Sequence, residues 1–179
     1  GCEGPDGKVR SGIVVVEYEG NWLSQGAVTW TVLKDFYVDG LKVEGTRTVT
    51  NKAFDQSEMI LTQTVKIDNG KVIWPDETFI TRTSERTHKL KVGDSFNDIE
   101  LEVSGIASGT TRAGHEYSAE TIEPLVFKSM CRGSIYLPAS GIKTITIPEL
   151  TNITVDYGDG SCDNKFMVIM DRGKKEITL

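Results

Sequence analysis

The sequence has no apolar run that approaches the roughly 20 residues a membrane-spanning helix needs. Helix-favouring residues are also scarce, since Leu and Ala together number 16 against 50 Thr, Val and Ile. No stretch shows a sustained apolar period of 3.6 residues. These absences argue against a helical bundle and against a spanning helix, and they predict an all-β fold.

Basic residues are fewer than acidic ones. The chain has 20 Lys and Arg against 26 Asp and Glu, which gives a formal net charge of −6. Nucleic-acid-binding proteins need a clustered basic surface, and the sequence shows none. We therefore expect no nucleic-acid partner.

Three cysteines, Cys2, Cys131 and Cys162, allow at most one disulfide within the chain. The favoured pair is Cys131–Cys162, which would tie the last hairpin to a strand that opens at Gly133. The alternative is three free thiols that are buried as small apolar side chains.

The chain begins without an initiator Met and without an apolar signal region. We expect a mature or truncated form, with any signal peptide and anchor outside it. A length of 179 residues fits a single all-β domain over 1–179, and no stretch resembles an interdomain linker.

Glycine-containing turns separate runs of alternating β-formers. Asp-Gly and Asn-Gly favour type I′ hairpin turns, because both central residues need positive φ. Two-residue loops then predict which residues face each other. The expected pairs are Val38–Leu41, Phe36–Val43 and Trp30–Val49 around Asp39-Gly40, Ile67–Val72 and Val65–Trp74 around Asn69-Gly70, Val168–Ile177 and Phe166–Leu179 around Arg172-Gly173, and Leu101–Val126 around Ala113-Gly114.

The same pattern predicts an antiparallel meander of about a dozen strands. A sheet of this size must split into a sandwich or become a strongly curved, partly rolled sheet to bury one face. The expected strands are 13–18, 28–38, 41–50, 59–68, 71–82, 99–106, 116–127, 133–137, 142–147, 151–157, 165–170 and 174–179.

An acidic loop is the segment most like a site. Asp159, Ser161 and Asp163 have the spacing of oxygens that begins many calcium loops. The match then breaks, since the sixth position is Asn164 and the twelfth is Met170. The loop is therefore either a structural turn or a weak calcium site, and no other cofactor is expected.

Six aromatic residues offer a platform for a glycan ligand: Tyr18, Trp22, Trp30, Phe36, Tyr37 and Trp74. Trp30, Phe36 and Trp74 fall on the predicted core face. Trp22 and Tyr37 remain as ligand-binding candidates.

Catalytic signals are few. His88 lies in a polar strand and His115 in a turn, and neither has a recognisable nucleophile motif near it. A glycosidase needs two carboxylates across a cleft. The strand carboxylates that could serve are Glu17, Glu19, Glu100, Glu102, Glu120 and Glu123.

Four ordered motifs resemble a family of uncharacterised secreted lipoproteins from gut Bacteroidetes. They are Cys2-x-Gly4-Pro5-Asp6-Gly7-Lys8, Phe36-Tyr37-Val38-x-Gly40, Ala107-Ser108-Gly109-Thr110-Thr111-Arg112-x-Gly114, and Asp156-Tyr157-Gly158-Asp159-Gly160-x-Cys162-Asp163-Asn164. The resemblance implies export, and a lipidated cysteine upstream of the domain as the only link to a membrane. An outer-membrane, periplasmic or cell-surface location follows from it.

These observations favour a non-enzymatic domain of the cell envelope that binds a glycan or an envelope protein, or that has a structural role. The competing hypothesis is a carboxylate-dependent hydrolase that acts on glycans.

Overall fold

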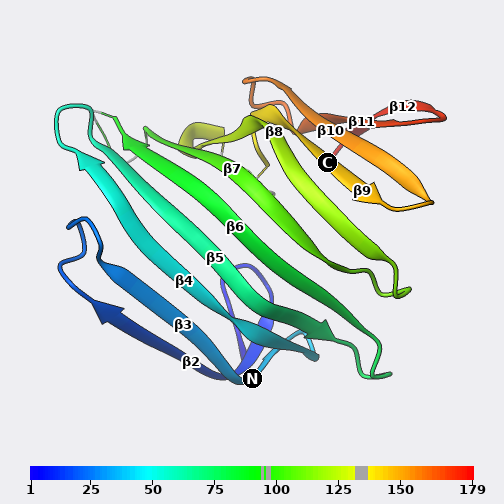
Figure 1. The fold of residues 1–179 in the computed structure, drawn as a ribbon, viewed down its shortest axis with the longest axis horizontal. Coiled ribbons are helices and arrows are strands. Elements are labelled where there is room, and N and C mark those ends of the chain that lie inside the picture. Colours follow the sequence, from blue (N-terminus) through cyan, green and yellow to red (C-terminus); the bar gives the residue numbers. More distant parts are fainter. Residues whose placement is uncertain (94, 96–97, 132–136) are drawn as a thin grey trace.

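The chain forms one antiparallel sheet of twelve strands that follow each other in chain order (Figure 1). The computed structural model describes residues 1–93, 95, 98–131 and 137–179. The predicted all-β antiparallel meander is confirmed. The strands are β1 (Cys2–Glu3), β2 (Val9–Glu19), β3 (Val28–Val38), β4 (Leu41–Asp55), β5 (Ile60–Ile73), β6 (Phe79–Val92), β7 (Ile99–Thr110), β8 (Glu116–Lys128), β9 (Ser140–Ile147), β10 (Thr151–Asp159), β11 (Lys165–Met170) and β12 (Gly173–Thr178), with a 3-10 turn, η1 (Ser129–Cys131), after β8.

The sheet is a single layer over most of its width. A compact protein of 19.7 kDa exposes about 8,600 Å², whereas this chain exposes 11,647 Å². Among the described residues, no large side chain is fully buried. Both faces of the sheet therefore reach solvent, and the sandwich alternative is wrong.

The two faces differ in chemistry. Residues that face each other across neighbouring strands share a face, and successive residues alternate. The apolar face carries Val49, Val65, Val103, Leu125 and Val155, which are all buried. The polar face carries the cross-strand row Lys66, Glu85, Ile106, Glu120 and Thr144.

The hydrophobic core lies where the sheet curls over its own apolar face. Val103 of β7 and Leu125 of β8 form one buried cluster with Val155 and Tyr157 of β10. The Tyr157 and Phe166 rings add a contact at 5.8 Å between centroids. Since β10 is three strands away from β7 in the sheet, only strong curvature brings these side chains together. Figure 1 shows the C-terminal strands turning away from the direction of β4–β7.

Glycines inside strands mark the points where the register shifts. Gly105 of β7 has φ +137°, and a Cβ there would lie 2.2 Å from the Glu85 carbonyl oxygen and 2.7 Å from the Arg86 Cα. The register of β7 against β8 shifts between Val103 and Ile106, and the extra residues of this bulge lie on β8, between Glu120 and Leu125. Such bulges bend a strand and increase its twist. Equivalent close approaches occur at Gly12, Gly45 and Gly141.

The first predicted hairpin is partly right. Val38 faces Leu41 and Phe36 faces Val43, as expected. A bulge then follows at Asp35, which has φ 45°, so Trp30 faces Thr48 instead of Val49. The inserted residue moves Trp30 to the polar face, which corrects its predicted place beside Phe36.

The predicted turn at Asn69-Gly70 is wrong, because these residues form a bulge inside β5. Asn69 has φ 53°, and the strand continues to Ile73. The real turn follows at Trp74, whose amide donates to the Thr78 carbonyl oxygen at 2.9 Å. The pairs Ile67–Val72 and Val65–Trp74 are therefore wrong. An Asn-Gly dipeptide supplies the positive φ that a bulge needs as well as a turn does.

The β11–β12 and β7–β8 pairs are also shifted from the predicted registers, by two residues and by one residue. The last loop is Asp171-Arg172, so Phe166 faces Ile177 and Val168 faces Lys175. This shift of two residues replaces the predicted Phe166–Leu179 and Val168–Ile177 pairs but keeps each side chain on its face. Leu101 faces Phe127 rather than Val126. Of the predicted strand 133–137, residues 133–136 lie outside the described residues.

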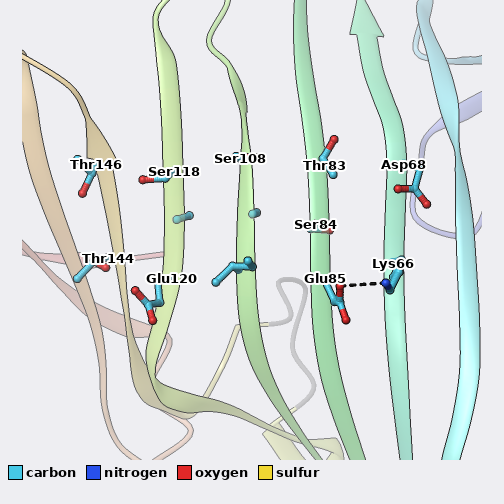
Figure 2. Close-up of a pocket in the computed structure, with 13 residues that line it drawn as sticks. Lys66, Asp68, Thr83, Ser84, Glu85, Ser108, Ser118, Glu120, Thr144 and Thr146 are labelled. Carbon is cyan, nitrogen blue, oxygen red and sulfur yellow. Dashed lines mark ion pairs between the residues drawn. The ribbon is translucent and has the colours of Figure 1, made fainter.

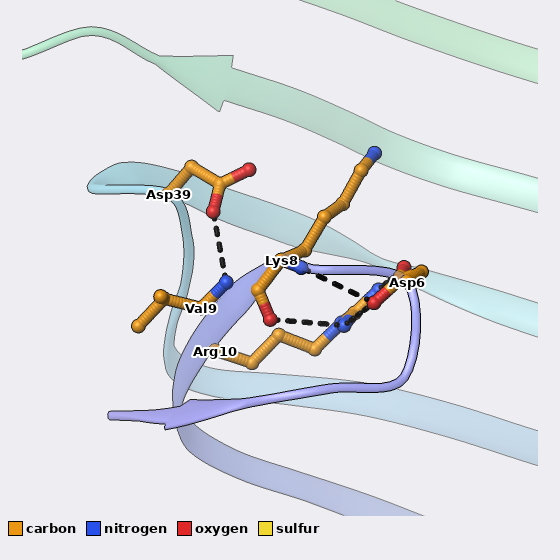
Figure 3. A network of polar contacts seen from close by, with 5 residues as sticks. All are labelled: Asp6, Lys8, Val9, Arg10 and Asp39. Carbon is orange, nitrogen blue, oxygen red and sulfur yellow. Dashed lines mark hydrogen bonds and ion pairs between the residues drawn. The ribbon is translucent and has the colours of Figure 1, made fainter.

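The N-terminal hairpin is held by charged hydrogen bonds (Figure 3). The Arg10 guanidinium donates to both carboxylate oxygens of Asp6, at 2.8 and 2.6 Å. This bond holds the pKa of Asp6 well below its usual value. The Val9 amide donates to the Asp39 carboxylate at 2.8 Å, and the Asp39 amide donates to the Val9 carbonyl oxygen at 2.8 Å. The hairpin is thereby joined to the β3–β4 turn.

Replacing Gly105 by alanine should destabilise the fold by about 3 kcal/mol or more, because the new Cβ both strains the backbone and collides with β6. The matched control is Gly114→Ala in the β7–β8 turn. Gly114 has φ +85° and open space around its Cβ position, so the cost should be only about 1 kcal/mol. Urea unfolding measures both, and equal losses would contradict the steric role of Gly105.

Candidate functional site

The acidic loop uses its carboxylates to cap turns. Asp159 accepts hydrogen bonds from the Ser161 amide at 3.2 Å and the Ser161 hydroxyl at 2.5 Å. These bonds lower the pKa of Asp159. Asp163 accepts from the Lys165 amide at 3.1 Å, and Asp156 accepts from the Gly158 amide at 2.9 Å. Each carboxylate thus serves its own turn.

The described residues include no cluster of three or more His, Cys, Asp or Glu side chains that could hold a metal ion. Asp159, Ser161 and Asp163 line one hollow together with Asp156, but their carboxylates do not form such a cluster.

The predicted Cys131–Cys162 disulfide is present, with its Cα atoms 5.0 Å apart. It joins η1 to the connection between β10 and β11. Lys128 donates to the Gly160 carbonyl oxygen beside it at 2.9 Å. The predicted link to a strand at Gly133 lies outside the described residues. Cys2 is an exposed free thiol.

A hollow of about 410 Å³ lies on the polar face, across β5 to β9 (Figure 2). Its polar side chains come from five neighbouring strands. Ile106 contributes an apolar side chain that is 59% exposed. The Lys66 ammonium and the Glu85 carboxylate form an ion pair at 3.0 Å inside it. The labelled residues are Lys66, Asp68, Thr83, Ser84, Glu85, Ser108, Ser118, Glu120, Thr144 and Thr146.

Two carboxylates of this hollow stand on either side of Ile106, since Glu85 and Glu120 both face it in the register. Two strand spacings separate their backbones by about 9.5 Å. Retaining glycosidases need about 5 Å between carboxyl groups and inverting ones about 6.5–9.5 Å. The backbone spacing does not fix the distance between the two carboxyl groups, which depends on the side-chain conformations, and the Lys66 ammonium already pairs with Glu85 at 3.0 Å. Glu120 is the one residue of this pair that the sequence had indicated.

A second hollow, of about 330 Å³, lies at the opposite end of the sheet beside the β2–β3 loop. Two aromatic side chains line it and remain open to solvent: Tyr18 is 80% exposed and Trp22 is 75% exposed. Thr29 and Gln63 supply hydroxyl and amide groups in the same hollow. Aromatic rings with nearby amides and hydroxyls are the groups that a sugar ring and its hydroxyls need.

A buried asparagine positions the Trp22 loop. Asn51 is 5% exposed, and its side-chain amide donates to the Trp22 carbonyl oxygen. Its backbone amide donates to the Ala27 carbonyl oxygen, and its own carbonyl accepts from the Gly26 amide, at 2.9 and 2.8 Å. Gln63 donates to the Asn51 side-chain oxygen at 2.8 Å. The loop is thus anchored at three points while the Trp22 ring stays exposed.

The structure does not bring Trp22 and Tyr37 together. Tyr37 lies at the far end of β3, about 30 Å from the strand's first residue, and it is on the polar face opposite Lys42. Tyr18 is the aromatic partner of Trp22 instead. Trp22 lies on the β2–β3 loop, so the alternation of residues along a strand could not predict that it lies beside Tyr18.

The other aromatic and histidine candidates have local roles. Arg112 stacks on Trp74 at 4.6 Å from the ring centroid and pairs with Asp76 at 2.6 Å. His88 lies on the apolar face, where burial and the charges of Arg47 and Arg86 lower its pKa. His115 is exposed in the β7–β8 turn.

None of the described helical residues forms a segment long and apolar enough to cross a membrane. Comparison with protein-family models, with curated proteins and with solved structures finds no match to this chain. The likeness to secreted lipoproteins therefore stays an expectation from the motifs.

Chelation with EDTA should leave the thermal unfolding midpoint unchanged, because Asp159 and Asp163 are already engaged in separate turns. Differential scanning calorimetry with EDTA and with added calcium measures this. A midpoint that falls with EDTA and rises with calcium would instead support the calcium site.

Loss of the disulfide should lower the free energy of unfolding by about 3–4 kcal/mol, given the sequence separation of 31 between Cys131 and Cys162. The test is urea unfolding of Cys131→Ser/Cys162→Ser, with Cys2→Ser as the matched control that removes the free thiol. If the double variant were as stable as the control, the crosslink would have no stabilising role.

Proposed function

We propose that this chain is a non-enzymatic, exported domain that binds a glycan of the cell envelope at the Tyr18–Trp22 hollow. The observation that carries the proposal is a pair of solvent-exposed aromatic rings that line one hollow. Tyr18 lies near the end of β2, and Trp22 lies on the following loop, which the buried Asn51 holds in place. Large exposed aromatic side chains on an anchored loop are typical of recognition surfaces. Gln63 and Thr29 lie beside them to bond hydroxyl groups.

Export is supported by the Cys131–Cys162 disulfide, since such bonds persist in oxidising compartments. The lipoprotein motifs favour an outer-membrane, periplasmic or cell-surface location, with a lipid anchor upstream of the domain. An envelope protein remains the second class of partner that the proposal allows.

The hydrolase alternative draws on one observation, the Glu85 and Glu120 carboxylates in the polar hollow. The Lys66–Glu85 ion pair favours a binding role over acid–base chemistry, because it already neutralises one of the two carboxylates. The two hypotheses place the ligand on opposite faces of the sheet, so substitutions in one hollow leave the other hollow intact and can distinguish them.

Trp22→Ala and Tyr18→Ala should each weaken glycan binding by about tenfold or more, because a ring covered by ligand contributes roughly 1.5 kcal/mol or more. A glycan array of envelope polysaccharides identifies a ligand, and calorimetry measures its affinity. The matched control is Tyr37→Ala, which removes an aromatic ring from the other face.

Three results would overturn the proposal. The first is an array without any bound glycan. The second is equal binding by Trp22→Ala and Tyr37→Ala. The third is release of reducing ends from a bound glycan that Glu85→Gln or Glu120→Gln abolishes, which would favour the hydrolase.

A further inference from the structure

Charge is divided between the two faces of the sheet. Every Asp and Glu that has a register partner in a described strand lies on the polar face. Cationic side chains of the described strands lie on both faces, and those of the apolar face include Arg47, Arg82 and Arg86. A protein of net charge −6 thus has one face that is apolar and cationic.

Within the described residues, the ion pairs of the sheet involve other Lys and Arg side chains, and Arg47, Arg82 and Arg86 form none. Burial, and after it the charge of Arg82, lower the pKa of Arg86. Like charges that lie close together repel each other, and an anion bound between them relieves this repulsion.

An apolar hollow of about 380 Å³ lies among these cations. Its floor is formed where two glycines meet, since a Cβ on Gly45 would lie 2.8 Å from the Gly70 Cα. Leu33, Val43, Ile67 and Ile80 contribute apolar lining. Arg47 and Arg82 line the same hollow. Glu44 also lines it, and its carboxylate pairs with Lys42 at 2.8 Å.

The size and chemistry of this hollow fit a small ligand. Ligand sites commonly have volumes of roughly 300–1,000 Å³, apolar walls and a few charged groups. A purely apolar ligand would leave the guanidinium groups unpaired, and a purely polar anion would leave the apolar lining unused. A second copy docked face to face would bring like cations together.

We propose that this hollow binds a single-chain amphiphile with an anionic head group. The hydrocarbon chain lies along the apolar lining above Gly45 and Gly70. The head group, a phosphate, sulfate or carboxylate, accepts charge-assisted hydrogen bonds from Arg47 and Arg82. This site is separate from the Tyr18–Trp22 hollow and does not depend on glycan binding.

The test compares decyl phosphate with decanol, both below their aggregation concentrations, by calorimetry on the full chain. We expect decyl phosphate to bind at least about tenfold more tightly than decanol, since a hydrogen bond to a charged group contributes roughly 1.5–3 kcal/mol. Arg47→Gln/Arg82→Gln should remove this difference and leave decanol binding unchanged. The matched control, Lys66→Gln/Lys89→Gln, removes the same charge from the polar face and should retain it.

Ile67→Ser tests the apolar lining and should weaken both ligands. Circular dichroism and thermal unfolding establish that each variant is folded. Equal affinity for the two ligands in the unmodified chain would overturn the role of the anion, and binding of neither would overturn the site. Light scattering that showed a dimer disrupted by Ile67→Ser would assign the hollow to a second copy instead.

Discussion

Close contact between glycine backbones and neighbouring strands is the constraint on which the shape of this protein depends. At Gly105 the facing Glu85 carbonyl oxygen occupies the place that a Cβ would need. Gly12 and Gly141 meet neighbouring backbone in the same way. A regular twelve-strand sheet would be a broad, twisted ribbon with no core. Bulges in the strands beside these glycines bend the sheet, and the curvature brings Val155 and Tyr157 of β10 into one cluster with Val103 and Leu125.

The same glycines shape the surface that remains open. Gly45 and Gly70 meet inside the sheet and leave a hollow where side chains would otherwise stand. Curvature buries the apolar face at the C-terminal end around Val155 and Tyr157. Toward the N-terminal strands no second layer covers that face, and its Arg47 and Arg82 side chains stay accessible to a ligand. The apolar face thus forms the core at its C-terminal end and carries the proposed ligand site nearer its N-terminal end.

The turn chemistry predicted some features well and others badly for a physical reason. Asp39-Gly40 forms the expected hairpin with Val38 opposite Leu41. Asn69-Gly70 has the same chemistry but continues inside β5, because positive φ serves a bulge as readily as a turn. A local signal therefore identifies where the chain takes positive φ, but the neighbouring strands decide what that conformation becomes. Each undetected bulge then moved later residues, such as Trp30, to the other face.

The sequence by itself determined the all-β class and the order of neighbouring strands, because β-propensity and turn residues act over short distances. The structure decided between the Cys131–Cys162 bond and three free thiols, which the sequence had left open. The tertiary structure decided which residues share a face, since one inserted residue reverses every assignment beyond it. It also decided that Trp22 shares a hollow with Tyr18 rather than with Tyr37. Arg47 and Arg82 share another hollow, where the carboxylate of Glu44 pairs with Lys42. These juxtapositions depend on the sum of several bulges across β2–β6, and no single segment of the sequence contains that sum.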